Sequence, residues 1–160
     1  MQDQLSTTTP ASSLTTENGD IIAIARMKTG VIIHQVNCQK VCGGAGLAKQ
    51  IANAYPKWAQ FFQRTTPSLG KATVMEVAPF VFVASLYSQQ AYGRDRRHTD
   101  YAAFRKALRA MASYEERYHE RTPNYYMPFG IGCGLGGGDW TIIEAIIIEE
   151  LPTAILVKRI

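Results

Sequence analysis

The sequence predicts an α/β fold with a largely parallel sheet, and three features of the chain favour it. Short β-branched runs alternate with segments of helical periodicity. Two strand-like runs end in glycine-rich loops that lead directly into helix-like segments. The length of 160 residues, with 46% hydrophobic and 19% charged residues, suits one globular domain with a sizeable core.

The chain opens with a Ser- and Thr-rich segment, residues 1–16. This segment predicts a flexible tail whose last residues add an edge strand, so the domain is expected to span residues 17–160. Asn18-Gly19 is a turn signal, and an apolar run follows at 21–25. Residues 31–36 are β-branched and almost continuously apolar, which is typical of a strand buried on both faces.

The first glycine loop covers residues 37–46 and leads into a predicted helix. Apolar residues of this helix recur at i, i+1, i+4, i+5 and i+8 from Leu47. Pro56 is expected to end or kink it.

The later elements continue the alternation of strand and helix signals. Thr99-Asp100 can cap a long helix whose apolar face begins at Tyr101, and Asp139 is a predicted N-cap for a second helix. The other predicted elements, in chain order, are strands 72–77 and 80–86, a loop 89–98, a strand 125–129, the second glycine loop 130–138, a helix 140–151 and a strand 154–157.

Both glycine loops follow strands, and α/β sheets bind ligands at the carboxyl ends of their strands. Glycine has no Cβ and tolerates positive φ, so successive N–H groups can point into one concavity. The helix that follows each loop adds the positive end of its dipole. The loops therefore predict a phosphate pocket for a nucleotide-like ligand, with Asp139 at its rim. The competing interpretation is that both loops are plain tight turns between packed elements.

The residues around the loops argue against several other sites. No Gly-Lys-Ser/Thr follows either loop, and no G-x-G-x-x-G with a later acid follows the first strand, so neither a nucleotide triphosphatase nor a dinucleotide dehydrogenase is expected. A thiol phosphatase built on Cys133 would need an arginine where Asp139 stands, so Cys133 is expected to be a packed residue. His34, Cys38 and Cys42 lie in a strand and a loop without a second ligand pair, so no metal or cofactor is predicted.

The net charge of +4 and the pI of about 9.0 suit an anionic small molecule, but they are too small to indicate nucleic acid. The basic stretch 94–109 lacks interleaved aromatic residues, which favours a solvated helix face. Three cysteines without disulfide-framework spacing favour a reducing, cytosolic setting. The chain has no run of ~18 apolar residues and no secretory signal, so no membrane association is expected.

Several of these motifs together resemble a known family. The stretches that carry the resemblance are 19–21, 34–38, 43–48, 89–90, 99–108 and 131–140. They are similar to a macro domain and, more narrowly, to the branch of ADP-ribose-1''-phosphate phosphatases found in yeast and phages. The resemblance covers roughly residues 17–158. It implies a three-layer α/β/α sandwich with a mixed, largely parallel sheet of about six strands.

The resemblance also implies an ADP-ribose site. Asp20, with Ile21 beside it, matches the acid that hydrogen-bonds the adenine amino group, and Asn37 matches the polar residue near the distal ribose. His34 and Asp139 match the catalytic pair of the phosphatase branch. The loop positions implied to surround the distal ribose and the diphosphate are Gly43, Gly44, Ala45, Gly46, Leu47, Gly132, Cys133, Gly134, Leu135, Gly136 and Gly137.

The first loop departs from the usual pattern of this branch. One residue is inserted, and Lys40 stands where glycine is common. A related antitoxin-like branch carries a lysine just before the last glycine of the loop, where this chain has Ala45. That difference argues against lysine-dependent removal of ADP-ribose from DNA.

The function implied is hydrolysis of ADP-ribose-1''-phosphate to ADP-ribose and phosphate, without a metal. The alternatives are removal of ADP-ribose from protein or nucleic acid, and a non-catalytic reader of ADP-ribose. The expected partner is the small molecule, ADP-ribose or its 1''-phosphate, rather than a membrane or nucleic acid, and the oligomeric state is left open. The expected location is the cytoplasm, the host's if the chain is phage-encoded.

Overall fold

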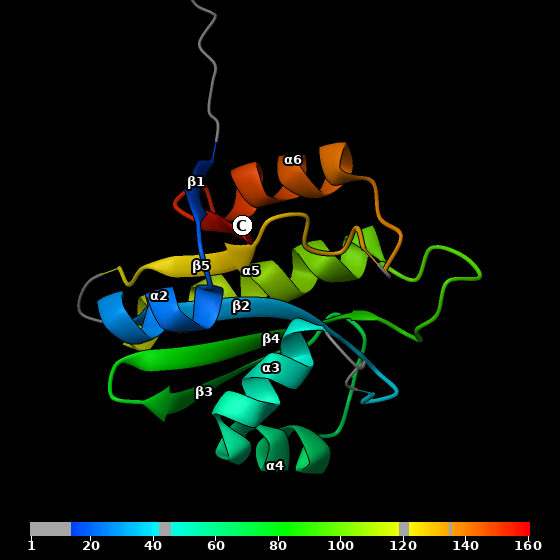
Figure 1. The fold of residues 1–160 in the computed structure, drawn as a ribbon. Helices are drawn as coiled ribbons and strands as arrows, with labels where there is room; N and C mark the ends of the chain where they lie inside the picture. Colours follow the sequence, from blue (N-terminus) through cyan, green and yellow to red (C-terminus); the bar gives the residue numbers. More distant parts are fainter. Residues whose placement is uncertain (1–13, 42–45, 119–121, 135) are drawn as a thin grey trace, which may run out of the picture.

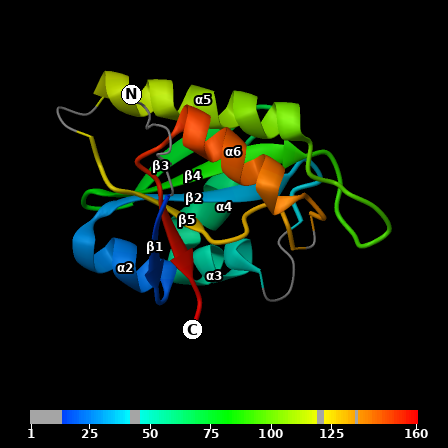
Figure 2. The same cartoon turned by 90° about the horizontal axis from the view of Figure 1, so that it is seen from above.

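The computed structural model describes residues 14–41, 46–118, 122–134 and 136–160. Over these residues the chain forms a six-stranded sheet in the order β1-β6-β5-β2-β4-β3. Helices cover both faces of the sheet: α2, α3 and α4 lie on one side, and α5 and α6 on the other (Figures 1 and 2). The elements are β1 Thr15–Asn18, α2 Ile21–Lys28, β2 Gly30–Asn37, α3 Leu47–Ala54, α4 Pro56–Arg64, β3 Ala72–Ala78, β4 Val81–Gln89, α5 Tyr101–Tyr118, β5 Tyr125–Pro128, α6 Trp140–Glu150 and β6 Ile155–Lys158.

The predicted three-layer sandwich with a mixed, largely parallel sheet is confirmed. All neighbouring strands pair in parallel except β3 and β4, which form an antiparallel hairpin. The predicted helix caps are also confirmed. The Asp139 carboxylate accepts from the Thr141 amide at the start of α6, and the Asp100 carboxylate accepts from the Ala103 amide at the start of α5.

Strand β2 lies between β5 and β4 and is buried on both faces. Val31 and Ile33 contribute to the core under α5 and α6, whereas Ile32 and Val36 contribute to the core under α2, α3 and α4. This double burial explains why the strand is a continuous apolar run rather than an alternating one.

The start of the folded domain differs in detail from the expected one. The edge strand anticipated at the end of the N-terminal segment forms over Thr15–Asn18, and the preceding Leu14 is buried, so the folded part begins before residue 17. The rest of the expected tail, residues 1–13, lies outside the described residues. The apolar run at 21–25 opens helix α2, which Asp20 caps.

Helix α4 was not predicted. Pro56 ends α3, as expected, but it also occupies the first turn of a second helix, where its missing N–H costs nothing. Trp58 and Phe62, four residues apart, bury the inner face of this helix, and that spacing was the signal available in the sequence. None of the helices in the described ranges is long and apolar enough to cross a membrane.

The contacts of Lys40 explain its departure from the usual loop pattern. Its backbone has φ of 60°, the left-handed region that favours glycine. Its ammonium group donates to the carbonyls of Gln63 and Thr65, the latter at 3.0 Å. These carbonyls lie at the carboxyl end of α4, where no intrahelical donor remains for them. The side chain therefore compensates for a strained backbone.

The positive φ of Lys40 predicts an unusual order of stability for two substitutions. Lys40→Gly and Lys40→Ala both remove the ammonium group, but only alanine keeps the left-handed strain. Lys40→Ala should therefore be less stable than Lys40→Gly by roughly 1 kcal/mol. Urea unfolding of both variants beside the wild type measures the difference. Equal midpoints for the two variants would contradict a strained φ at this residue.

Candidate functional site

The candidate site lies at the carboxyl edge of the sheet. Strands β1, β6, β5 and β2 are mutually parallel, so the segments that follow them all emerge at this edge. The start of the first glycine loop (cyan), the second glycine loop (orange) and the 89–98 loop (green) lie at the same end of the molecule in both ribbon views (Figures 1 and 2). The expected juxtaposition of the two glycine loops thus holds for the residues described on each.

The second glycine loop is tightly wound. Its backbone bonds run from the Cys133 amide to the Gly130 carbonyl (2.9 Å), from Gly137 to Gly134 (3.1 Å) and from Gly138 to Gly132 (2.8 Å). Gly130, Gly132 and Gly137 have positive φ. This winding requires glycine at these positions for backbone reasons alone.

Three glycines of this loop have unpaired amides in the described structure, and they differ in exposure: Gly134 is exposed, Gly132 half-buried and Gly136 buried. Within the described ranges, the N–H groups of Gly132, Gly134 and Gly136 donate to no protein acceptor. Gly134 is exposed, and a Cβ built on it would meet nothing within 4 Å. Unpaired amides beside open space can hold an anion such as a phosphate.

The first loop offers a second set of amides at the start of α3. Gly46 precedes this helix with an ordinary φ of −75° and supplies no side-chain cap, and a Cβ there would also meet nothing within 4 Å. In the described part of the chain, the Leu47 and Ala48 amides have no acceptor, as expected for a first helical turn. Gly43, Gly44 and Ala45 lie outside the described residues, as does Leu135 of the second loop.

Asp20 and Ile21 lie where β1 gives way to α2. One carboxylate oxygen of Asp20 accepts from the amides of Ile22 (2.9 Å) and Ala23 (3.1 Å), which caps the helix. Asp20 itself is exposed and no described group bonds its other oxygen, whereas Ile21 is buried against the core. A capping aspartate at this edge can therefore also accept a hydrogen bond from a ligand.

Asn37 closes the first loop on itself. Its side-chain amide donates to the Val41 carbonyl (3.0 Å) and accepts from the Val41 amide (3.2 Å). Asn37 is buried at the end of β2. Both ends of this side chain are thus already used to shape residues 37–41, so it acts on a ligand mainly through that loop.

The structure does not bring the expected catalytic pair together. His34 points to the face of the sheet under α4, where its ring meets Trp58 edge-on at 5.1 Å and it is 1% exposed. Asp139 lies on the α6 side of the sheet. A strand alternates its faces with every residue, so it is Gln35, not His34, that faces the second glycine loop. His34, which the resemblance implied as a catalytic residue, is therefore buried on the face of the sheet away from this loop.

His34 instead belongs to a buried polar cluster. Its Nε2 lies 2.7 Å from the Ser85 hydroxyl. The same hydroxyl accepts a hydrogen bond from the Trp58 indole N–H at 3.1 Å. Its Nδ1 has no hydrogen-bond partner among the described residues. Burial lowers the pKa of His34 to about 3, so the imidazole is uncharged at neutral pH.

Asp139 and Cys133 complete the described loop. Asp139 is exposed, and one of its carboxylate oxygens caps α6 while its own amide donates to the Tyr101 hydroxyl at 2.9 Å. Burial raises the pKa of the Cys133 thiol, and the Asp139 carboxylate raises it further. A protonated, packed Cys133 is a poor nucleophile, in agreement with the expectation from its sequence context.

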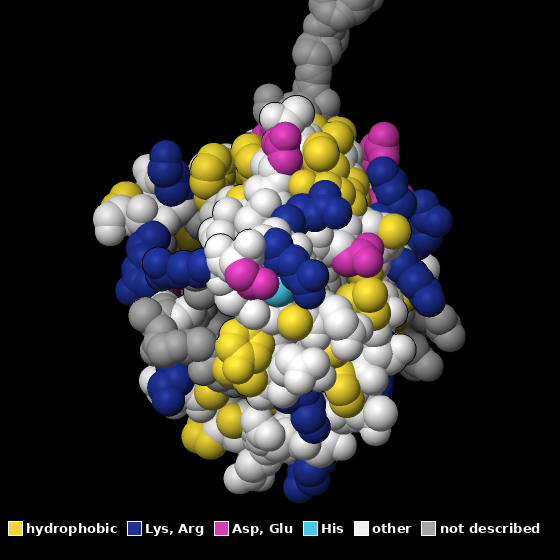
Figure 3. Space-filling view, turned by 90° about the vertical axis from the view of Figure 1, so that its right-hand side faces the viewer, with side chains coloured by type: hydrophobic (Ala, Val, Ile, Leu, Met, Phe, Trp, Pro, Cys, Tyr) yellow, Lys and Arg dark blue, Asp and Glu magenta, His cyan; other side chains and the backbone are white. Residues whose placement is uncertain are grey.

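The carboxyl edge carries more positive than negative side chains (Figure 3). Arg94, Arg96 and Arg97 on the 89–98 loop are exposed. The Arg97 guanidinium lies 4.4 Å from the Tyr101 ring centroid, and the Arg97 backbone contacts the position that a Cβ on Gly137 would occupy. A cationic loop therefore borders the second glycine loop, which favours an anionic ligand.

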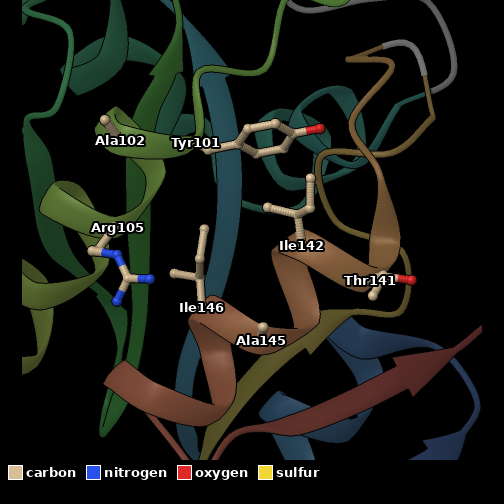
Figure 4. A pocket seen from close by; sticks show the side chains of 7 residues that line it. All are labelled: Tyr101, Ala102, Arg105, Thr141, Ile142, Ala145 and Ile146. Atoms are coloured by element: carbon tan, nitrogen blue, oxygen red, sulfur yellow. The ribbon is translucent and has the colours of Figure 1, made fainter.

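A groove of about 440 Å³ lies beside this site rather than in it. It runs between α5 and α6, and Figure 4 shows its lining side chains. They are Tyr101, Ala102, Arg105, Thr141, Ile142, Ala145 and Ile146. The cation among them, Arg105, pairs with Glu149 and Glu150 at 2.7 Å each. Because the lining is mostly apolar and the charge is neutralised, the groove does not suit a phosphate.

Comparison with known proteins gives one curated relative and several solved structures with a similar fold. No model of a protein family matches the chain. A curated relative, the uncharacterized 17.5 kDa protein in the tk–vs intergenic region of Enterobacteria phage T4, is 31% identical over 138 residues, which are 81% of this chain and 84% of that protein.

Solved structures share the fold over nearly the whole chain. A protein of unknown function from Bacteroides thetaiotaomicron has 26% identity and a TM-score of 0.76, with 94% of this chain and all of that one covered. A macrodomain protein from Streptomyces coelicolor has 20% identity and a TM-score of 0.71 over 92% and 99% of the two chains. Thermosipho africanus DarTG, solved in complex with ADP-ribose, has 15% identity and a TM-score of 0.69 over 92% of this chain and 42% of its own. The chain thus has the macrodomain fold.

The burial of His34 predicts a specific loss of stability in mild acid. Its pKa in the folded state is below the ordinary value of 6.5, so the unfolded state binds more protons between pH 6.5 and pH 3. The free energy of unfolding should fall by roughly 2 kcal/mol between pH 7 and pH 5 from this group alone. Urea unfolding at both pH values measures it, and His34→Gln, which cannot titrate, is the control. Equal pH slopes for the two proteins would contradict a buried, neutral imidazole.

Proposed function

The chain belongs to the same family as the 17.5 kDa phage T4 protein. From its macrodomain fold and the resemblance of its motifs to the phosphatase branch, we propose that it binds ADP-ribose and hydrolyses ADP-ribose-1''-phosphate to ADP-ribose and phosphate. The observation that carries the proposal is that the amides of Gly132, Gly134 and Gly136, at the carboxyl edge, have no acceptor among the described residues. A structural neighbour from Thermosipho africanus holds ADP-ribose, which supports the choice of ligand.

The proposed ligand would lie along the carboxyl edge from β1 to β2. The free carboxylate oxygen of Asp20 would accept from the adenine amino group. The amides of the second glycine loop would hold the diphosphate, and the loop closed by Asn37 together with the first turn of α3 would surround the distal ribose. The exposed arginines of the 89–98 loop would add attraction for the anion.

For the reaction, Asp139 is the remaining candidate of the expected pair. One of its oxygens is committed to capping α6, and no described group bonds the other. That oxygen could orient a water molecule for attack on the 1''-phosphorus, with the loop amides stabilising the charge that develops on the phosphate oxygens. His34 has no part in this step, because its ring is enclosed under Trp58.

A non-catalytic reader of ADP-ribose is the second candidate function. The burial of His34 favours it, because one exposed carboxylate is then the only side chain of the expected pair at the site. Binding and turnover therefore need separate tests.

Gly134 offers a test of binding. Gly134→Ala adds a methyl group where the protein has open space, so the free energy of unfolding should change by less than about 0.5 kcal/mol. The methyl group would lie where the diphosphate approaches, so ADP-ribose affinity should fall about tenfold. Calorimetric titration of both proteins measures this. Wild-type protein that binds no ADP-ribose would refute the proposed ligand, and unchanged affinity in the variant would refute its placement.

Asp139 offers a test of turnover. Asp139→Asn keeps a good helix cap but removes the charge, so stability should be nearly unchanged while phosphate release from ADP-ribose-1''-phosphate falls on the order of 100-fold. Phosphate release at the wild-type rate would exclude Asp139. Binding without release by the wild type would favour the reader, and release of ADP-ribose from modified protein or nucleic acid would favour the hydrolase alternative.

A further inference from the structure

We propose that Thr99 is a positioning residue that sets the anion-binding geometry of the second glycine loop, an inference that rests on the proposed function. Thr99 precedes α5 and was expected only to help cap that helix. The carboxylate of Asp100 alone caps α5, which leaves the Thr99 side chain available for another role.

Thr99 binds both ends of the loop. Its hydroxyl donates to the Gly132 carbonyl at 2.7 Å, and its backbone amide donates to the Gly136 carbonyl at 3.0 Å. The His98 amide donates to the same Gly136 carbonyl at 2.8 Å. Two of the loop's carbonyls are therefore held toward the protein and away from an anion, which they would repel.

The peptide units that are held toward Thr99 are not those that carry the free amides. The unit that carries the Gly132 carbonyl also carries the Cys133 amide, and the unit that carries the Gly136 carbonyl also carries the Gly137 amide. Both of those amides donate within the loop. The amides of Gly132, Gly134 and Gly136 belong to other peptide units of the loop, and they have no acceptor among the described residues. Fixing the two bonded units therefore restricts how the neighbouring amides can be oriented toward a ligand.

A chain of side chains holds the Thr99 hydroxyl in place. The Ser88 hydroxyl donates to Oε1 of Gln35 (2.9 Å), and Nε2 of Gln35 donates to the Thr99 hydroxyl (3.1 Å). The direction of donation along this chain ends at the Gly132 carbonyl, although the Ser88 hydroxyl also lies 3.5 Å from the Leu86 carbonyl. Ser88 and Thr99 are at most 1% exposed and Gln35 is half-buried, so these bonds are largely shielded from water. The loop is thereby anchored to β2 and β4, two neighbouring strands of the sheet.

The steric fit of the loop on Thr99 is equally specific. A Cβ on Gly136 would overlap the Thr99 hydroxyl, and one on Gly138 would lie 2.7 Å from the Gly132 carbonyl oxygen. The loop therefore needs glycine at position 136 in order to pack against Thr99, and at position 138 in order to pack against its own backbone. A preorganised set of donors binds an anion without reorganisation at the moment of binding.

The test compares two variants of Thr99. Thr99→Val has the same shape but no hydroxyl, and Thr99→Ser keeps the hydroxyl. ADP-ribose affinity should fall at least tenfold in the valine variant and stay within about threefold of wild type in the serine variant. Val83→Ala, in the core on the other face of the sheet, is the control for a general loss of stability, and its affinity should equal that of the wild type.

Amide NMR separates this inference from the proposed function. In Thr99→Val the N–H signals of Gly132, Gly134 and Gly136 should shift or broaden, whereas in Thr99→Ser they should match the wild type. If wild-type protein binds no ADP-ribose, the proposed function fails, and inorganic pyrophosphate then serves as the probe of the same amides. Loop signals and affinity for the probe that are unchanged in Thr99→Val, or an affinity loss no larger than in Val83→Ala, would overturn the role of Thr99.

Discussion

The parallel alignment of four neighbouring strands is the constraint on which the rest of the structure depends. Hydrogen bonding of β2 to β5, β5 to β6 and β6 to β1 makes all four strands end at one edge of the sheet. The segments that hold Asp20, Asn37 and Gly132 are far apart in the sequence, but each follows one of these strands. No direct contact between these segments is needed to bring them to one edge, because the sheet does so.

Within that frame, the alternation of faces along a strand decides what each polar residue can do. His34 and Gln35 are neighbours in the centre of β2, yet His34 is enclosed with Trp58 and Ser85 on one face, and Gln35 bonds Thr99 on the other. A strand that is apolar on both faces gives no indication of which face the ligand loops approach. For this reason nothing in the pattern of the strand corrected the catalytic role that the resemblance implied for His34, and nothing in it pointed to Gln35.

The sequence predicted well what depends on local periodicity and turn chemistry. The strands of the sheet, helix α6 and the caps Asp100 and Asp139 all follow from patterns within a few residues. What it did not predict depends on contacts between distant segments. Thr99 bonds Gly132, 33 positions away, and Lys40 bonds Gln63 and Thr65 at the end of α4, and neither set of contacts leaves a local signal.

The glycines themselves separate a ligand site from a plain turn. Gly132 has a backbone that requires glycine, and Gly136 and Gly138 have no room for a Cβ, so folding alone accounts for these three. Gly134 and Gly46 differ: neither has a positive φ, and each faces open space. An alanine at either position would cost the fold little and would gain backbone rigidity. The fold therefore does not require glycine at these two positions, whereas close approach of a ligand to the backbone would require it. Both positions lie at the edge of the sheet that carries the amides without a described acceptor.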